Sequence, residues 1–225
     1  MCGRFTTTLP TAQLLEAFEV GESLHEAPVS FNMAPGRGTP VIYHEHGRNI
    51  LSVFRWGLVP SWAKDPAIGN RLINARAETV AEKPSFRSAF RKRRCLILAD
   101  GFYEWKLEGG KKTPYYISVK GRPVFAFAGL WESWTTPEGE DLRTCAIITT
   151  HANSFMATLH HRMPVILPKE AEPGWLDPAE INPARLQRFL QPCPSEWLRA
   201  HSVSTNVNSP RHDSPELILP LENND

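Results

Sequence analysis

Apolar residues gather in short runs through the middle of the chain, and these runs are rich in β-branched and aromatic side chains. That composition is typical of strands. The predicted strands are ILSVF (50–54), CLILA (95–99), YYISV (115–119), VFAFAGL (124–130), TCAIITT (144–150) and PVIL (164–167).

Helical spacing of apolar residues is rarer. A first helix is predicted over 11–19, with its leucines and a phenylalanine on one face. Others are predicted near 78–91, interrupted by a proline, near 151–159, and from Asn182, a good N-cap followed by a proline. Helices do not alternate regularly with the strands. The pattern therefore predicts an α+β fold with a strongly curved, barrel-like, mixed or antiparallel sheet and flanking helices.

The size and composition fit one soluble globular domain. The chain has 225 residues, of which 41% are hydrophobic and 22% charged. It contains no apolar stretch of membrane-spanning length and no signal peptide at its start, so we expect a cytoplasmic protein. The end of the chain, SPRHDSPELILPLENND, is predicted to be an extended strap that ends in disorder.

Charge is unevenly distributed, although the formal net charge is only +1. Lysines and arginines concentrate between Arg71 and Arg94, whereas the segment from Asp213 onward carries acids and neither Lys nor Arg. This asymmetry permits a local anion-binding face. A basic surface segment that is simply solvated has the same appearance, so charge alone does not decide the function.

The four cysteines are Cys2, Cys95, Cys145 and Cys193. None shows C-x-x-C spacing, which argues against a structural zinc site, and a reducing cytosol disfavours disulfides. Cys95 and Cys145 lie in apolar runs and are expected to be small buried hydrophobes. Cys2 lies in no such run. It is either an incidental residue at a frayed terminus or a residue with a chemical role.

Removal of Met1 would give Cys2 a thiol and an α-amine on adjacent carbons. That pair suits the capture of an aldehyde, because the amine forms a Schiff base and the thiol closes a five-membered thiazolidine. Both groups have reference pKa values of about 8, so both are partly available at neutral pH.

Further segments combine polar and aromatic residues with turns. Carboxylate and imidazole groups are the usual acid–base pair, arginines bind phosphates, and exposed tryptophans stack on unpaired bases. Each segment also has a purely structural interpretation, and for Trp56 packing in the core is favoured. The segments are FNMAPG (31–36), RWGLVPSW (55–62), INARAET (73–79), ADGFYEWK (99–106) and LHHRMPVIL (159–167).

Together with MCGRF at the start, these motifs resemble the SOS response-associated peptidase (SRAP) family, the abasic-site processing proteins. The resemblance implies an SRAP domain over 1–220 with a distorted β-barrel and a positively charged DNA channel, followed by a short tail, 221–225. It implies a monomer that crosslinks covalently to abasic sites in single-stranded DNA and shields them during replication and the SOS response. It calls for no metal or cofactor. Lyase activity, crosslink reversal and autoproteolytic peptidase activity are also implied, as is association with the nucleoid when DNA is bound.

The resemblance also assigns roles to individual residues. Cys2 matches the crosslinking cysteine, Asn74 the asparagine that positions its amine, and Glu104 the catalytic glutamate. His160 matches the histidine of an H-D-R-x-P motif that reads H-H-R-M-P here, so His161 replaces the aspartate. The residues expected to contact DNA are Arg4, Arg76 and Arg162 on phosphates, Trp62 and Trp105 on bases, and Asn32, which either lines the site or builds its turn.

Two other functions compete with this interpretation. An N-terminal-nucleophile amidohydrolase, such as a glutaminase domain, also often begins Met-Cys-Gly, and it would hydrolyse glutamine without forming a DNA adduct. A non-catalytic module that binds single-stranded DNA would bind reversibly, and its binding would survive Cys2→Ala. A structural protein without a site would leave the clustered motifs unexplained.

Overall fold

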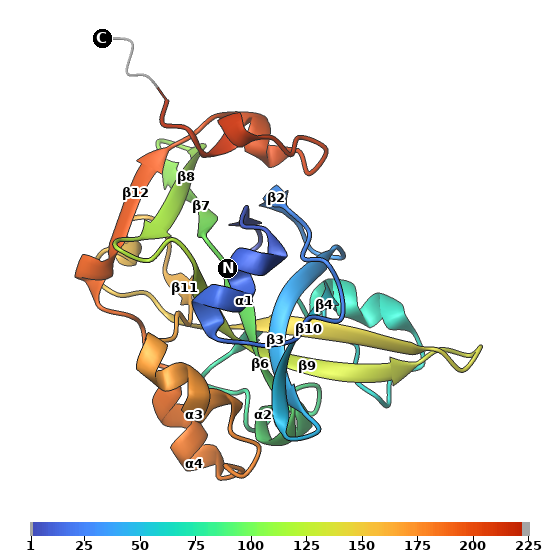
Figure 1. The fold of residues 1–225 in the computed structure, drawn as a ribbon. Helices are drawn as coiled ribbons and strands as arrows, with labels where there is room; N and C mark the ends of the chain where they lie inside the picture. Colours follow the sequence, from blue (N-terminus) through green and yellow to red (C-terminus); the bar gives the residue numbers. More distant parts are fainter. Residues whose placement is uncertain (1, 222–225) are drawn as a thin grey trace.

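Two curved sheets form the body of the protein (Figure 1). The computed structural model describes residues 2–221. One sheet is antiparallel throughout, with the strand order β12-β8-β7-β1-β2. Its strands are β1 (Phe5–Thr7), β2 (Ser30–Met33), β7 (Gly101–Glu108), β8 (Lys111–Val119) and β12 (Leu198–Ser202).

The second sheet closes on itself. Strand β10 pairs with β4, β4 with β3, β3 with β6, β6 with β9, and β9 again with β10. The β4–β10 and β5–β10 pairs are parallel and the others antiparallel, so the predicted mixed, barrel-like α+β fold is confirmed. The strands are β3 (Gly38–Glu45), β4 (Arg48–Trp56), β5 (Asn74–Arg76), β6 (Arg94–Ala99), β9 (Phe125–Thr135), β10 (Asp141–His151) and β11 (Arg162–Pro164).

Aromatic packing joins the two sheets. Phe5 of β1 lies 5.0 Å from Trp56 and 5.8 Å from Phe127, measured between ring centroids. Strand β6 is buried at all of its positions, which explains its nearly uninterrupted apolar sequence. Trp56 is a core residue, as expected, and Cys95 and Cys145 are fully buried. Because β1 begins three residues after Cys2, this core fixes the start of the chain against the barrel.

Helices are short and lie around the sheets. The helix predicted over 11–19 is confirmed as α1 (Thr11–Phe18), and Asn182 caps α4 through the backbone N–H of Ala184. Within residues 2–221, no helix is long and apolar enough to cross a membrane. The remaining helical elements are α2 (Arg87–Lys92), α3 (Glu172–Leu176), α4 (Pro183–Leu186), η1 (Pro66–Arg71), η2 (Met156–Thr158), η3 (Lys169–Ala171), η4 (Gln187–Phe189), η5 (Ser195–Trp197), η6 (Thr205–Asn208) and η7 (Pro215–Ile218).

Several predicted elements differ from those observed. The helix near 78–91 shortens to α2, and the one near 151–159 is a single 3₁₀ turn, η2. Of the predicted strand 164–167, only the first residue belongs to β11. Beyond it, the backbone leaves the regular β10–β11 ladder and makes single hydrogen bonds, one to β10 and the others to β9. The segment after β12 is a strap of two 3₁₀ turns across the first sheet, and residues 222–225 of the predicted tail lie outside the described part.

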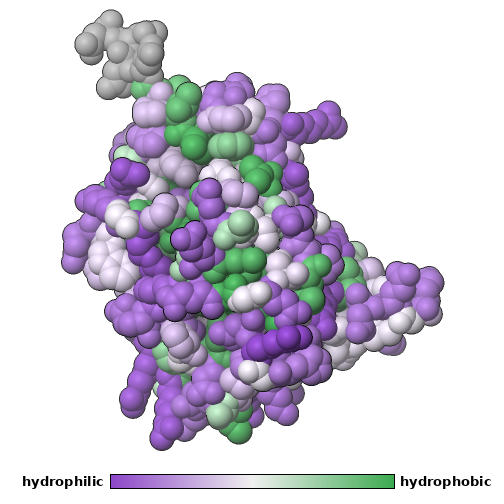
Figure 2. Space-filling model, in the orientation of Figure 1, coloured by the Kyte–Doolittle hydropathy of each residue, from purple (hydrophilic) through white to green (hydrophobic). Residues whose placement is uncertain are grey.

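The surface of the face seen in Figure 1 is mainly hydrophilic. In Figure 2 the hydrophobic residues of this face form small separate groups between polar and charged ones. Such scattered exposure is ordinary for a folded protein. The surface colouring therefore does not locate the site, and its residues must be found from the side-chain geometry.

Gly101 makes a close backbone approach that a side chain would obstruct. A Cβ at this position would collide with the ring of Tyr116 on β8. We expect Gly101→Ala to lower the free energy of unfolding by about 1–3 kcal/mol through overpacking. Urea unfolding measures the loss, with Gly21→Ala as control, because a Cβ at Gly21 meets nothing within 4 Å. Equal stability of the two variants would contradict this account.

Candidate functional site

Cys2 is held in place by a residue that lies far from it in the sequence. The side-chain Nδ2 of Asn74 donates a hydrogen bond to the Cys2 carbonyl oxygen at 2.8 Å. Asn74 begins β5, which pairs in parallel with β10 opposite Ile147. Cys2 itself is fully buried. The structure thus brings together two of the residues predicted to form the site.

Glu104 lies on β7, with a side chain that is almost completely buried. Burial, and then the charge of Glu104, raise the pKa of the Cys2 thiol well above its ordinary value. That electrostatic effect requires the carboxylate to lie close to the sulfur. The strand is registered against the N-terminal segment by the backbone hydrogen bond from Tyr103 N–H to the Arg4 carbonyl, 3.0 Å.

His160 follows η2 and is fixed by its own chain. The backbone N–H of Arg162 donates to Nδ1 of His160 at 3.0 Å, and the Arg162 carbonyl oxygen lies 3.2 Å from the same nitrogen, so the backbone of Arg162 fixes the orientation of the ring. The ring stacks on that of His161 with centroids 4.3 Å apart, and this neighbour lowers the pKa of His161. His160 is half-buried, whereas His161 is exposed.

Glu104 and His160 line the same open cavity, which has a volume of about 790 Å³. The side chains of Trp105, His161 and Asn208 line it as well. This volume lies in the range of ligand-binding pockets, about 300–1,000 Å³. A carboxylate and an imidazole at one cavity can transfer protons to and from a bound molecule. Residues 2–221 contain no group of three or more His, Cys, Asp or Glu side chains arranged to hold a metal ion.

Arg76 and Arg162 belong to strands that flank β10. Arg76 is exposed on β5. Arg162 begins β11, donates to the Thr149 carbonyl at 2.6 Å, and forms an ion pair with Glu78 at 2.6 Å. This hydrogen-bonded partner lowers the pKa of Glu78. Arg162 is therefore anchored, and Arg76 is the more accessible cation of the two.

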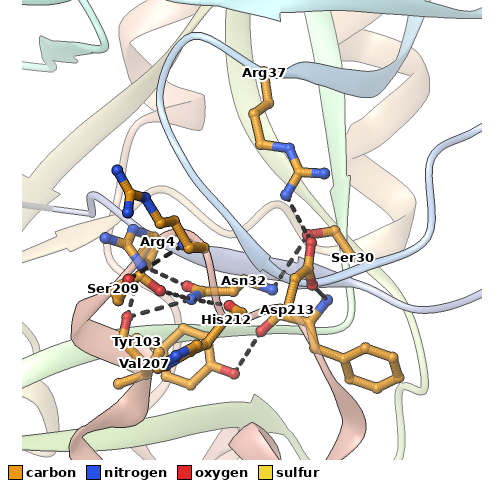
Figure 3. Close-up of polar contacts among 11 residues, drawn as sticks. Arg4, Ser30, Asn32, Arg37, Tyr103, Val207, Ser209, His212 and Asp213 are labelled. Carbon is orange, nitrogen blue, oxygen red and sulfur yellow. Dashed lines mark hydrogen bonds and ion pairs between the residues drawn. The ribbon is translucent and has the colours of Figure 1, made fainter.

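Arg4 and Asn32 contact the C-terminal strap, residues 203–221 (Figure 3). Arg4 donates to the carbonyls of Val207 and Asn208 and to the side-chain oxygen of Asn32. The Asn32 side chain is completely buried. Asn32 therefore exposes no surface in this structure, and its amide donates hydrogen bonds to the strap carbonyls of Ser209 and His212.

The structure separates the two tryptophans that were expected to stack on bases. Trp105 is half-exposed at the main cavity. Trp62 is 58% exposed and lines a different cavity of about 320 Å³ with Lys64 and Arg71. Only Trp105 therefore shares a cavity with Glu104 and His160.

Asn208 is a residue of this cavity that the sequence did not identify. It lies in η6, and its Oδ1 accepts a hydrogen bond from the indole N–H of Trp105 at 2.7 Å. The segment VSTNVNS around it has the Ser and Asn residues of a turn, which is too common a signal to indicate a site.

The buried thiols make the stability of the fold sensitive to alkali. Burial raises the pKa of Cys2, Cys95 and Cys145, and that of Cys193 to about 12. Unfolded thiols lose their protons near pH 8.5, while folded ones stay protonated, so stability is fully present below that pH and is lost above it. We expect each thiol to lower the free energy of unfolding by up to about 1.4 kcal/mol per pH unit above pH 8.5.

Urea unfolding between pH 7.5 and 9.5 under reducing conditions measures this slope. Cys145→Ala, which removes one buried thiol, is expected to make the slope shallower. A free energy of unfolding that stays constant over this range would contradict the assignment.

Comparison with known proteins places this geometry in a family. The family model described as SOS response associated peptidase (SRAP) matches residues 1–210. The chain is 48% identical to the Bacillus subtilis protein named abasic site processing protein YoqW, over 97% of this chain and 99% of that one. It is 35% identical to the Gallus gallus abasic site processing protein HMCES, over 99% of this chain and 78% of that one.

A solved structure has the same fold. The crystal structure of a Bacteroides thetaiotaomicron protein superposes with a TM-score of 0.87 at 29% identity, covering 97% of this chain and 99% of that one. The family model, the identity to these relatives and the common fold agree over nearly the whole chain, and the chain belongs to the SRAP family.

Proposed function

We propose that this protein processes abasic sites in single-stranded DNA by forming a covalent crosslink through Cys2. The observation that carries the proposal is the hydrogen bond from Asn74 to the Cys2 carbonyl, beside a carboxylate and an imidazole that share one cavity. Relatives named abasic site processing proteins support the substrate class. The chemistry requires a free α-amine on Cys2 and hence removal of Met1, which lies outside the described residues.

The first step opens the sugar. An abasic deoxyribose is mostly a closed hemiacetal, and it reacts with an amine only as the open aldehyde. His160 supplies or removes the proton on the ring oxygen during opening. The fixed orientation of its ring, with Nδ1 held by the Arg162 N–H, suits this role better than the exposed ring of His161.

The second step joins protein and DNA. The Cys2 amine adds to the aldehyde carbon, and loss of one water leaves a Schiff base, with Glu104 transferring the protons. Sulfur then adds to the imine carbon while the thiol proton moves to the nitrogen, which closes the thiazolidine. The raised pKa of the buried thiol keeps it protonated at neutral pH, so the proton needed at nitrogen is available.

Two further activities follow from the same intermediates. A reaction that stops at the Schiff base allows β-elimination and strand cleavage, which is a lyase activity. Reversal of each step releases the protein. The peptidase activity in the family description would act on the protein's own N-terminal region, and we propose it only as an autoproteolytic step.

The proposed DNA contacts divide according to accessibility. Arg76 and Arg162 contact phosphates and Trp105 stacks on a base, whereas Trp62 contacts the strand further from the lesion. Arg4 and Asn32 act through the strap that they fasten. Binding by a monomer is expected to weaken as salt concentration rises, because phosphate contacts release counterions.

A crosslinking assay tests the proposal. Purified protein is incubated with a single-stranded oligonucleotide that carries one abasic site, and denaturing electrophoresis detects the adduct. We expect an adduct that survives heating, is absent with intact DNA, and is lost in Cys2→Ala. Reversible binding that Cys2→Ala retains would instead favour a non-covalent single-strand binding module.

An N-terminal-nucleophile amidohydrolase remains the alternative enzyme. It would use the same thiol to attack an amide and form a thioester. Ammonia release from glutamine, measured in parallel and without any adduct, would support it. We favour crosslinking, because a cavity that combines Glu104, His160 and a half-exposed tryptophan is not needed for amide hydrolysis.

A further inference from the structure

The C-terminal strap is fastened directly over the N-terminal segment. The Nδ2 group of Asn32 donates to the carbonyls of Ser209 and His212 at 3.0 and 2.7 Å, and Arg4 donates to the carbonyl of Val207 at 2.7 Å (Figure 3). These bonds lie on both sides of Asn208 in the sequence. They fix the backbone from which the Asn208 side chain extends.

Asp213 secures the same strap further along the chain. Its carboxylate accepts hydrogen bonds from the Ser30 hydroxyl at 2.9 Å and from the Phe31 N–H at 2.6 Å, and it forms an ion pair with Arg37 at 2.6 Å. Leu217 of the strap is itself buried, in a cluster with Tyr103 and Tyr116. The strap is therefore a fixed wall of the molecule in this structure.

The orientation of the Asn208 amide follows from its partner. The indole N–H of Trp105 can only donate, so the Asn208 atom that faces it at 2.7 Å must be the oxygen. The NH₂ end then remains as a donor on an exposed side chain that lines the main cavity. Trp105 and Asn208 thus present an aromatic ring next to hydrogen-bond donors.

We propose that Trp105 and Asn208 form a subsite for the nucleobase next to the abasic nucleotide, with the ring stacked on Trp105 and a base-edge oxygen or nitrogen bound by the Asn208 amide. This inference rests on the proposed function. An uncharged amide beside an aromatic face suits a base, which offers both a π-face and acceptor atoms. A cavity of about 790 Å³ is also larger than an abasic sugar alone requires.

A phosphate is the less favoured ligand for this pair. Two lysines, Lys106 and Lys112, also line this cavity, and Lys106 forms an ion pair with Glu108 at 2.5 Å. Neither Trp105 nor Asn208 carries a charge. A phosphate of the bound strand would be attracted to these lysines, whereas the uncharged amide next to the indole ring suits a base.

The test combines protein variants with altered substrates. One oligonucleotide carries the abasic site between normal nucleotides. In two others, the 5′ or the 3′ neighbour is a tetrahydrofuran spacer that has a sugar and phosphates but no base and no aldehyde. The readouts are the half-saturating DNA concentration and the maximal rate constant for adduct formation by wild type, Asn208→Ala and Asn208→Asp.

We expect Asn208→Ala to raise the half-saturating concentration about 3- to 10-fold on the normal substrate, the effect of one lost hydrogen bond. The maximal rate constant should change little. The effect should disappear when the base on one particular side is absent. Asn208→Asp keeps an oxygen for the Trp105 indole but removes the donors. It should therefore raise the half-saturating concentration on the normal substrate as much as Asn208→Ala does.

Three results would overturn the subsite. The rise in the half-saturating concentration could be equal with and without the neighbouring base, which would indicate a phosphate contact. It could appear in Asn208→Ala but not in Asn208→Asp, which would indicate that Asn208 only anchors Trp105. It could also be absent in both variants. Failure of wild type to form any adduct with the normal substrate would instead refute the proposed function.

Discussion

Glu104→Gln should slow adduct formation by about 10²- to 10⁴-fold, the usual contribution of a general acid–base group. The amide keeps the size and shape of the side chain but cannot take up a proton at neutral pH. It therefore impairs the proton transfers that accompany loss of water from the amine–aldehyde adduct. Single-turnover kinetics on denaturing gels measure the effect.

The same substitution should alter the Cys2 thiol in a defined direction. The negative charge of Glu104 is the second cause, after burial, of the raised thiol pKa. Glu104→Gln should therefore lower that pKa, which the thiolate absorbance of the variant reports against a Cys2→Ser background. A thiol pKa that is unchanged or raised would show that the carboxylate is not close enough to act on Cys2.

Glu108→Gln is the matched control for this experiment. Glu108 lies on the same strand, and its side chain is 57% exposed and paired with Lys106. We expect crosslinking by this variant at close to the wild-type rate. Equal slowing in both variants would indicate a general effect of charge on β7 and would remove Glu104 from the mechanism.

Cys2→Ser should separate the two bonds of the crosslink. After removal of Met1 the serine still offers an α-amine, so a Schiff base can form, but the weaker hydroxyl nucleophile does not close a stable ring. The expected result is loss of the heat-stable adduct, retention of an adduct that borohydride traps, and more strand cleavage by β-elimination. Denaturing gels with and without borohydride measure all three.

The outcome of Cys2→Ser also tests the order of events. A heat-stable adduct in this variant would show that sulfur is not required. Loss of both the stable and the trapped adduct, in a variant that unfolds like wild type, would show that the thiol acts before the amine. Either result would contradict the proposed sequence of amine attack followed by ring closure.

Much of the fold could be predicted from local sequence patterns. Strands such as β6 and β10 are buried on both faces, so they appear as apolar runs in the sequence. Strand β7 was not predicted because Glu104 interrupts its aromatic residues at a buried position. A buried carboxylate in a strand conflicts with ordinary patterning, and such conflicts are expected at functional sites.

The composition of the site could be predicted only in part. The motifs pointed to Cys2, Asn74, Glu104 and His160, and the structure brings Asn74 to Cys2 and places Glu104 with His160. Asn208 could not be found in this way, because its contact with Trp105 joins residues 103 positions apart. The burial of Asn32 under the strap depends on the same long-range packing.

Intact mass spectrometry of the crosslinked product tests the central claim most directly. Protein and an abasic single-stranded oligonucleotide are allowed to react, heated, and weighed without any reducing agent for imines. The account predicts a species equal to the chain without Met1 plus the oligonucleotide minus one water, with digestion placing the DNA on Cys2. The absence of this species from protein that has lost Met1, or attachment at another residue, would contradict it.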